Sequence, residues 1–348
     1  MAHAETRGGH AARETHRAAD GEVDLARIAR HLRALSFPRR TGGPGESRAV
    51  AFLCAALRGL GLQPRVEPFL FSPLALERVL PSAMLCASAL VLLAARHIRP
   101  SPRRAGEMLT LGFAAGLPAM RWTGFTERML DLPGALPSQN LVVELPSLEE
   151  SESHLVLMAH YDSKSQRLPG PVRWGLALAA VGGAAALLYT TARCAPRHLP
   201  PPRRTMWLAG ISAAALAALA VNKPADRSPG ALDNAAGLAV WLELARAFAT
   251  DRPRRTRITL VATGAEEEGL AGAVRFFQTH KEEIGPHPWV INLDAVGSKG
   301  PLAILSASGV PPLSTGAPLA RRLRHTAHEL GIPARVLWMP PGIATDHL

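Results

Sequence analysis

The sequence predicts an α/β protein with a largely parallel central sheet flanked by helices, into which two hydrophobic helical hairpins are inserted. Short apolar, β-branched runs alternate with segments whose apolar positions recur at helical spacing, which is the pattern of parallel strands joined by helices. Four apolar stretches rich in alanine and leucine carry no charged residue, and they occur as two pairs. Polar residues follow several predicted strands, at the edge of a parallel sheet where ligands bind.

The N-terminal residues predict a tail, two helices and a strand. Residues 1–21 are polar and contain no apolar run, so we expect a disordered tail and no secretory signal peptide. Apolar positions recur at helical spacing over residues 23–35 and again over 46–60, where Gly61 follows as a stop signal. Residues 64–71 are expected to form a strand.

The charge-free stretches predict membrane hairpins. They are residues 79–95 and 108–120, and then 174–192 and 206–221. A span needs about 20 apolar residues, within a range of about 17–25, so the first and third qualify, the fourth is marginal and the second is short. The alternative is a set of buried core helices. The repeated pattern of two apolar helices around a short basic, proline-containing loop favours membrane hairpins, which we place at residues 75–121 and 169–223.

The remaining strands and helices alternate along the chain. We expect strands at residues 140–145, 154–159, 257–262, 289–293 and 334–338, and helices at residues 237–248 and 317–330.

An acidic stretch follows the strand at residues 257–262. It contains Glu266, Glu267 and Glu268, and three consecutive carboxylates at the end of a buried strand are costly unless something compensates them. A solvated acidic loop would compensate them. A metal site would do so as well, with one glutamate binding the cation and its neighbour moving a proton.

Other stretches place potential metal ligands after apolar runs. They contribute His160 with Asp162, Asp233, Asp294 and His347. Each has a structural alternative: a lone histidine is often structural, Asp233 could be a helix N-cap, and Asp294 could be a satisfied strand-end carboxylate. Together, however, they form a set of oxygen and nitrogen ligands that suits zinc, with one carboxylate free to bridge two ions.

The order of these motifs resembles that of the co-catalytic zinc aminopeptidases of peptidase family M28. The order is H-x-D, D-N-A-x-G, A-E-E-x-G-L, N-L-D and D-H. The resemblance covers residues 22–74, 122–168 and 224–348, which we expect to be three parts of one peptidase domain. It implies the family's mixed sheet flanked by helices, and a di-zinc exopeptidase that removes N-terminal residues from peptides.

The resemblance also implies roles for the motif residues. Asp233 would bridge two zinc ions, with His160 and Asp294 completing one site and Glu267 and His347 completing the other. Glu266 would be the general base, taking a proton from a zinc-bound water and passing it to the leaving amine. Asp162 would accept the second N–H of His160 and fix its tautomer. We expect Glu268 to face solvent.

Two departures from the family pattern have consequences. The gap from His160 to Asp233 holds the second hairpin, which places a membrane hairpin between two zinc ligands and close to the substrate cleft. The chain ends at Leu348, where family members continue with further strand and helix, so we expect a peptidase domain truncated at its C-terminus or a poorly held His347.

The resemblance implies peptide substrates and the hairpins imply membrane lipid as partners, whereas composition argues against nucleic acid. The net charge of +11 comes almost entirely from arginine, and aromatic content is 5%, with no stretch that interleaves basic and aromatic residues. We therefore expect no nucleic-acid partner. Cys54, Cys86 and Cys194 form no C-x-x-C motif, so neither a disulfide framework nor a cysteine zinc site is predicted. The sequence does not define the oligomeric state.

The arginines of the hairpin loops predict a membrane orientation. Each loop carries four of them: Arg96, Arg99, Arg103 and Arg104 in the first, and Arg193, Arg197, Arg203 and Arg204 in the second. The positive-inside rule places both loops in the cytoplasm, and hence the catalytic domain of this multi-pass protein outside the cytoplasm. The arginine-rich N-terminal region argues for the opposite orientation.

Two other functions are compatible with the same fold. One is a non-catalytic receptor or scaffold relative, and the other is a single-zinc glutaminyl cyclase. The presence of Glu266 and of every predicted ligand favours the peptidase.

Overall fold

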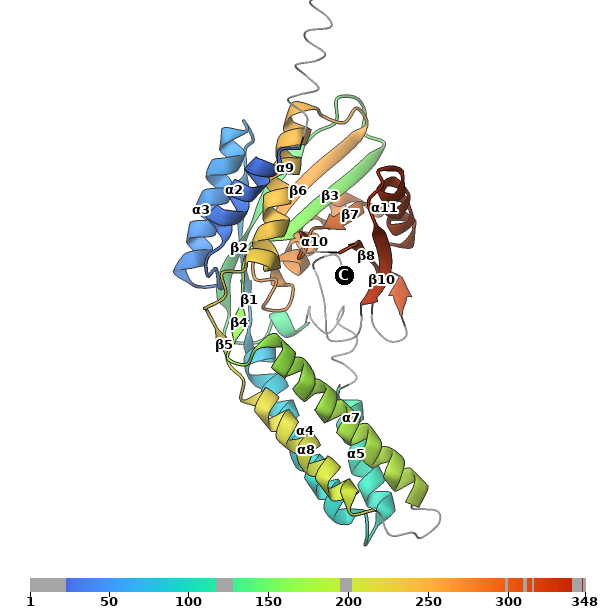
Figure 1. Cartoon of the computed structure of the whole chain (residues 1–348). Coiled ribbons are helices and arrows are strands. Elements are labelled where there is room, and N and C mark those ends of the chain that lie inside the picture. The colour runs from blue at the N-terminus through green and yellow to red at the C-terminus, as the bar shows by residue number, and fades with distance from the viewer. Residues whose placement is uncertain are drawn as a thin grey trace, which may run out of the picture.

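The computed structural model describes residues 23–116, 128–194, 202–297, 300–308, 312–314, 316–339 and 346. They form a sheet domain and a bundle of helices that projects from one end of it (Figure 1). The predicted tail at residues 1–21 and the predicted ligand His347 lie outside the described residues.

A five-stranded mixed sheet forms the centre of the domain, in the order β1-β2-β6-β3-β7. Strand β3 is parallel to both β6 and β7, whereas β2 is antiparallel to β1 and β6. This confirms the predicted mixed sheet, whose parallel part contains the strands that precede the predicted ligands. The strands are β1 (Arg65–Phe71), β2 (Leu136–Leu145), β3 (Ser153–His160), β6 (Thr256–Thr263) and β7 (Trp289–Asn292).

Helices cover both faces of this sheet. The first face packs against α2 (Leu25–Leu35), α3 (Pro44–Gly59) and α9 (Ala236–Thr250), in a core that includes Leu53, Leu141 and Trp241. The other face packs against α10 (Ala271–Ile284). Since each strand alternates its side chains between the faces, β6 buries Leu260 in one core and Val261 in the other.

The C-terminal residues form a second, smaller sheet with the order β10-β8-β9. Strand β10 (Ala334–Met339) is parallel to β8 (Leu302–Ser308), and β9 (Leu313–Ser314) is antiparallel to β8. Helix α11 (Ala317–Glu329) connects β9 to β10. The predicted helix and final strand are present, but β8 and β9 were not predicted.

The two predicted hairpins pack together into one bundle. A π-helical turn (Ala75–Val79) leads into α4 (Leu80–His97), which packs on α5 (Pro102–Gly116) and α8 (Arg204–Ala220). Helix α7 (Gly170–Cys194) packs on α8 and α5. The hydroxyls of Ser88 and Ser212 donate to the carbonyls of Ala213 and Ala180 at 2.9 and 2.7 Å, which links α4 and α7 to α8.

Within the described residues, Ala75–His97 and Gly170–Cys194 are the two helices long and apolar enough to cross a membrane. Only 17% and 28% of their apolar windows are buried, whereas a core helix of a soluble protein is mostly buried. Helix α8 is apolar but shorter. Length, composition and exposure together favour membrane association of this bundle.

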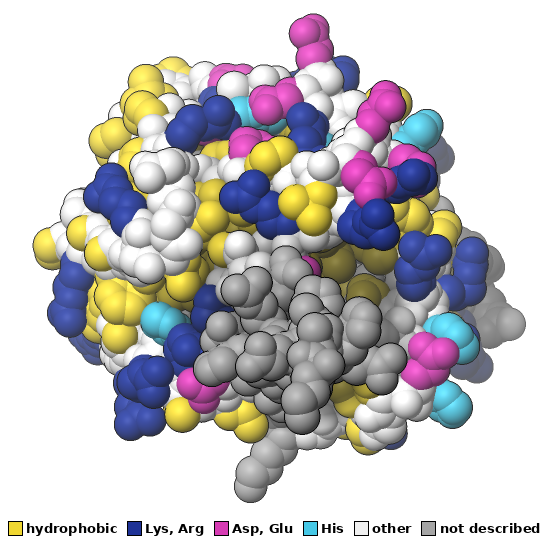
Figure 2. Space-filling view, turned by 90° about the horizontal axis from the view of Figure 1, so that it is seen from above, with side chains coloured by type: hydrophobic (Ala, Val, Ile, Leu, Met, Phe, Trp, Pro, Cys, Tyr) yellow, Lys and Arg dark blue, Asp and Glu magenta, His cyan; other side chains and the backbone are white. Residues whose placement is uncertain are grey.

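The sheet domain has a different surface. On its face opposite the bundle, basic and acidic side chains are intermixed, with hydrophobic side chains between them (Figure 2). A mixed surface of this kind is typical of contact with water.

Candidate metal centre

The parallel strands bring the predicted motifs to one edge of the sheet. His160 is the last residue of β3 and lies opposite Thr263, the last residue of β6. Met158 lies opposite Asn292, the last residue of β7, and Asp294 follows two residues later. The chain therefore leaves all three strands at the same edge.

His160 is the centre of the cluster. Its Nε2 atom lies 3.1 Å from Oδ1 of Asp233, 3.7 Å from Oδ1 of Asp294 and 4.0 Å from Oε2 of Glu266. The imidazole is 1% exposed, whereas the Asp233 side chain is 59% exposed and faces the open side of the cluster. His160, Glu266 and Asp294 each offer a ligand atom, and these atoms lie within 4.8 Å of one another.

The donor set fits a zinc ion. Both ring nitrogens of His160 are buried and lack a hydrogen-bond partner among the described residues, which is costly for a buried polar group. Carboxylates surround the Nε2 atom, and a single imidazole among carboxylates is a nitrogen-and-oxygen set that zinc accepts. A bound cation would satisfy these groups.

The electrostatics of the cluster support this fit. Burial raises the pKa of Glu266 well above its usual value, and the attraction of His160 only partly offsets burial and the nearby carboxylates. Burial and the repulsion of Asp233 and Asp162 raise the pKa of Glu267 to about 7. Burial is also the largest cause that raises the pKa of Asp346 to about 7. Several carboxylates gathered around one buried imidazole form an anionic cluster suited to a divalent cation.

Asp162 holds the acidic loop as well as facing His160. Its Oδ1 lies 3.4 Å from Nδ1 of His160. The same carboxylate accepts the backbone N–H groups of Glu266 and Glu267, both at 3.1 Å, and the hydroxyl of Thr41 at 3.3 Å. It thereby fixes the position of the acidic loop relative to the imidazole, a contact that the sequence did not predict.

The expectation that Glu268 faces solvent is wrong. Its side chain is 4% exposed, and Oε2 accepts a hydrogen bond from Nζ of Lys164 at 2.9 Å. The Nε atom of Arg40 lies 3.8 Å from Oε1. Lys164 also donates to the Glu267 carbonyl at 2.9 Å. Glu268 is buried because two cations from distant parts of the chain compensate its charge.

Arg39 connects the loop before Asp233 to the end of β3, and sequence reasoning missed it. The side chain is completely buried, and it donates to the carbonyls of Tyr161 at 2.8 Å, Pro229 at 2.9 Å and Gly230 at 3.1 Å. Burial lowers its pKa to about 10, although Asp162 and Asp233 act in the opposite direction. In a chain rich in arginine, no local pattern distinguishes this one.

The D-N-A-x-G motif has a clear structural role. The Asn234 amide nitrogen donates to the Leu293 carbonyl at 2.8 Å, and its oxygen accepts the backbone N–H of Gly237 at 3.1 Å. A side chain on Gly237 would lie 2.1 Å from that oxygen, which explains the glycine. Asn234 thus fixes Asp233 relative to the Asp294 loop. Asp233 makes no side-chain cap on α9, so the N-cap alternative is not observed.

The structure brings together His160, Asp162, Asp233, Glu266 and Asp294. Glu267 is close enough to Asp233 for their charges to repel, but it is not among the described residues with ligand atoms around His160. His347 lies outside the described residues, and its neighbour Asp346 accepts a hydrogen bond from the Thr263 hydroxyl at the end of β6.

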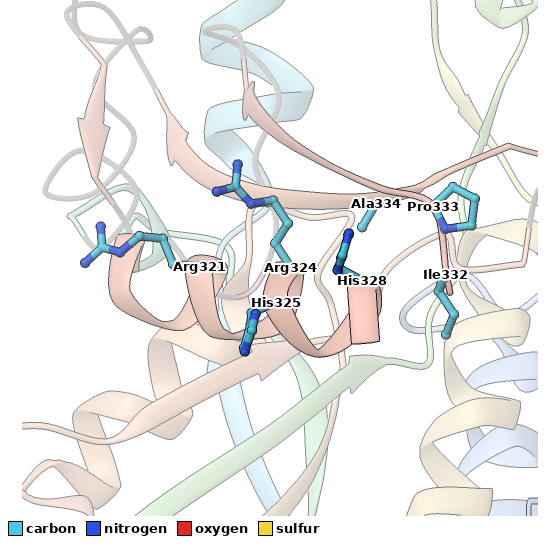
Figure 3. A pocket seen from close by; sticks show the side chains of 7 residues that line it. All are labelled: Arg321, Arg324, His325, His328, Ile332, Pro333 and Ala334. Carbon is cyan, nitrogen blue, oxygen red and sulfur yellow. The ribbon is translucent and has the colours of Figure 1, made fainter. Parts of the chain in front are cut away.

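A separate basic pocket of about 510 Å³ lies on α11. Figure 3 shows Arg321, Arg324, His325 and His328 projecting from this helix, with Ile332, Pro333 and Ala334 on the segment that follows it. Its lining contains none of the predicted site residues that the structure describes.

Known proteins match the C-terminal part of the chain. Residues 218–337 match the model of peptidase family M28. A probable zinc metalloprotease of Pyrenophora teres f. teres is 40% identical over 106 residues, which are 30% of this chain and 23% of that protein. A probable zinc metalloprotease of Pyrenophora tritici-repentis is 48% identical over 71 residues, 20% of this chain and 16% of that protein. These matches support the resemblance to peptidase family M28 that the motifs predicted, and the matched segments span under a quarter of these relatives.

Among solved structures, a leucine aminopeptidase precursor from Bacteroides thetaiotaomicron VPI-5482 is similar, with a TM-score of 0.49 and 12% identity. The match covers 94% of this chain and 80% of that chain.

Proposed function

We propose that this protein is a membrane-anchored, zinc-dependent aminopeptidase that hydrolyses N-terminal peptide bonds with a two-zinc-activated water and Glu266 as general base. The observation that carries this proposal is His160, whose ring nitrogens have no hydrogen-bond partner among the described residues and are surrounded by Asp233, Glu266 and Asp294. The match of residues 218–337 to the family M28 model and relatives named probable zinc metalloproteases support zinc as the metal.

The residues of the cluster would hold two ions. His160, Asp233 and Asp294 would bind the first, and Asp233, Glu267 and His347 would bind the second, with Asp233 as the bridge. Bound zinc supplies Lewis acidity and lowers the pKa of a coordinated water. The Asp233 side chain is 59% exposed, so solvent and substrate can reach this ligand.

Glu266 would move the proton. Its backbone is held by Asp162, and its carboxylate lies at the His160 cluster with a side chain only 10% exposed. It would accept a proton from the attacking water and deliver it to the leaving amine, so that the amine departs in neutral form. Asp162 would keep both Glu266 and His160 in position during this transfer.

The bundle would anchor the protein in a membrane as a multi-pass domain. Its two basic loops, between α4 and α5 and between α7 and α8, follow the ends of α4 and α7 that are remote from the sheet domain (Figure 1). If arginine-rich loops stay in the cytoplasm, the sheet domain lies outside it. Reporter fusions in both loops test this orientation, and loops reached only from outside the cell would reverse it.

A peptidase assay tests the enzymatic proposal. The purified full chain is given one peptide with a free N-terminus, the same peptide acetylated, and a peptide with N-terminal glutamine. We expect release of the first residue from the free peptide alone, loss of activity with a chelator, and recovery with zinc. Metal analysis should give about two zinc ions per chain, both lost in Asp233→Asn.

Other outcomes favour the other functions. Cyclisation of the glutamine peptide without hydrolysis, with one zinc ion per chain, would identify a glutaminyl cyclase. A zinc-loaded or metal-free protein that leaves every peptide intact would identify a scaffold relative.

A further inference from the structure

The metal-binding edge of the sheet faces the helix bundle. Strands β3 and β6 run toward the end of the domain from which the bundle projects (Figure 1). A short ladder fixes this arrangement, because β4 (Ser165–Gln166) before α7 pairs with β5 (Pro224–Ala225) after α8. Both ends of the α7–α8 hairpin are therefore attached beside the site.

Arg40 connects the acidic loop to the first bundle helix directly. Its guanidinium lies 3.8 Å from Oε1 of Glu268 and 2.9 Å from Oε1 of Glu77, which is in the turn that begins Ala75–His97. The backbone N–H of Arg40 also donates to Asp226, beside β5, at 3.3 Å. With bonds of about 1.3 Å inside the guanidinium, the carboxylates of Glu268 and Glu77 lie within roughly 10 Å of each other.

Glu77 marks the boundary of the apolar surface. The charge-free stretch at residues 79–95 begins two residues later, which is about 3 Å along a helix with a rise of about 1.5 Å per residue. Beyond this point large apolar side chains such as Leu85 and Leu92 are exposed. The headgroup layer is only about 5–7 Å thick on each side of the hydrocarbon, so in a bilayer the acidic loop lies near headgroup level.

We propose that the substrates are membrane-anchored polypeptides whose free N-terminus emerges a few residues above the bilayer. This inference rests on the aminopeptidase function proposed above and names its substrate class. Glu266 of the metal cluster is two residues before Glu268 in the chain, so an extended substrate of roughly six residues at about 3.3 Å each reaches the cluster from the bilayer surface. An anchor in the same membrane also raises the effective concentration of the N-terminus at the site.

Reconstituted protein tests this with a series of linkers. The full chain is placed in phosphatidylcholine vesicles together with a series of substrate peptides. All the peptides share one N-terminal sequence, which is followed by a Gly/Ser linker of increasing length and a C-terminal acyl anchor. We expect hydrolysis to begin at linkers of roughly six residues, with a kcat/KM at least about tenfold above that of the same peptide without an anchor. The Glu266→Gln protein should cleave none of the series.

The dependence on linker length distinguishes this inference from a simpler explanation, in which the anchor only concentrates peptides at the vesicle surface. That explanation predicts faster hydrolysis of every anchored peptide, whatever its linker length. Hydrolysis that begins only beyond about 15 residues would place the site far from the bilayer and overturn the inference. Equal rates for anchored and unanchored peptides would overturn it too, while leaving the aminopeptidase function intact. Failure to cleave any peptide in the presence of zinc would refute the aminopeptidase function and this inference with it.

Discussion

The sheet domain and the helix bundle arrange their apolar side chains in opposite ways. The sheet domain buries large residues such as Leu141 and Trp241 completely, and its visible face mixes charges of both signs. The bundle fills much of its interior with alanine, as at Ala94 and Ala209, while Leu178 is 75% and Trp207 is 77% exposed. The two parts of the chain therefore bury apolar side chains differently, and the exposed apolar side chains of the bundle agree with the membrane anchor that we propose.

Buried polar groups also differ between the two parts. In the sheet domain they include charged pairs, such as Glu268 with Lys164. In the bundle they include the hydroxyls of Ser88 and Ser212, which join neighbouring helices. The domain thus contains buried charges that need a partner, whereas the buried hydroxyls of the bundle form neutral hydrogen bonds between helices.

The largest expected effect is the loss of hydrolysis in a variant that stays anchored in the membrane. Glu266→Gln should lower the hydrolysis rate by about 10²–10⁴-fold, because it removes the general base and keeps the shape of the side chain. Zinc content and retention in membranes after an alkaline carbonate wash should not change. Glu282→Gln, at an exposed position on α10, is the control. Near-normal turnover of Glu266→Gln would assign the base to another residue.

A charge on the bundle surface tests whether lipid surrounds it. Leu178→Arg on α7 should reduce the amount of inserted protein, because an arginine near the centre of a membrane helix costs about 2.5–3.5 kcal/mol. Leu148→Arg, at a position 65% exposed between β2 and β3, should stay within about 0.5 kcal/mol of the original stability. Membrane-fraction yield and thermal unfolding measure both. Equal, small effects would mean that water surrounds both residues.

Two adjacent glycines test the close packing of α7 on α8. A Cβ on Gly183 would lie 2.9 Å from Cβ of Ser212 and 3.1 Å from the Leu208 carbonyl oxygen, whereas one on Gly182 would meet nothing within 4 Å. Gly183→Val should therefore destabilise the bundle by about 1–3 kcal/mol through overpacking. Thermal unfolding in detergent should show no comparable loss for Gly182→Val. A loss of the same size in both variants would contradict the described helix contact.

The smallest expected effect is a pH-dependent change in the stability of the sheet domain. Burial lowers the pKa of His280, but its hydrogen bonds to Glu283 and Glu67 outweigh burial and raise the pKa overall. A raised pKa in the folded state adds stability below pH 6.5, and this contribution is lost as the pH rises through the folded value. His280→Gln should thus lower the Tm more at pH 5.5 than at pH 8.5. A Tm difference independent of pH would show that the charge of His280 does not matter.

The sequence predicted what depends on local pattern. The helix expected at residues 23–35 is observed at Leu25–Leu35, and the strand expected at 257–262 is observed at Thr256–Thr263. The motif order implied that His160, Glu266 and Asp294 belong to one site, and the structure brings them together at the common edge where the parallel strands end.

What the sequence did not predict depends on contacts between distant residues. Glu268 looked like any charged loop residue until Lys164 and Arg40 were found beside it. Arg39 is one arginine among many, and only the fold shows that it joins Tyr161 to Gly230. Both hairpins pack into one bundle through contacts between helices that are far apart in the chain, as between Ser88 and Ala213. No local pattern identifies which residues will meet in such contacts.

The insertion of α7 and α8 between His160 and Asp233 has a consequence for biogenesis. Because Asp233 follows both helices in the chain, the ribosome must complete the hairpin before His160 can meet Asp233, the bridging ligand that we propose. If the bundle spans a membrane, both residues must also end on the same side of it. A chain whose second hairpin stalls or inserts the wrong way round keeps the histidine and the aspartate apart. Peptide hydrolysis by this protein would therefore measure correct insertion, and misinserted copies would not cleave other proteins in the membrane.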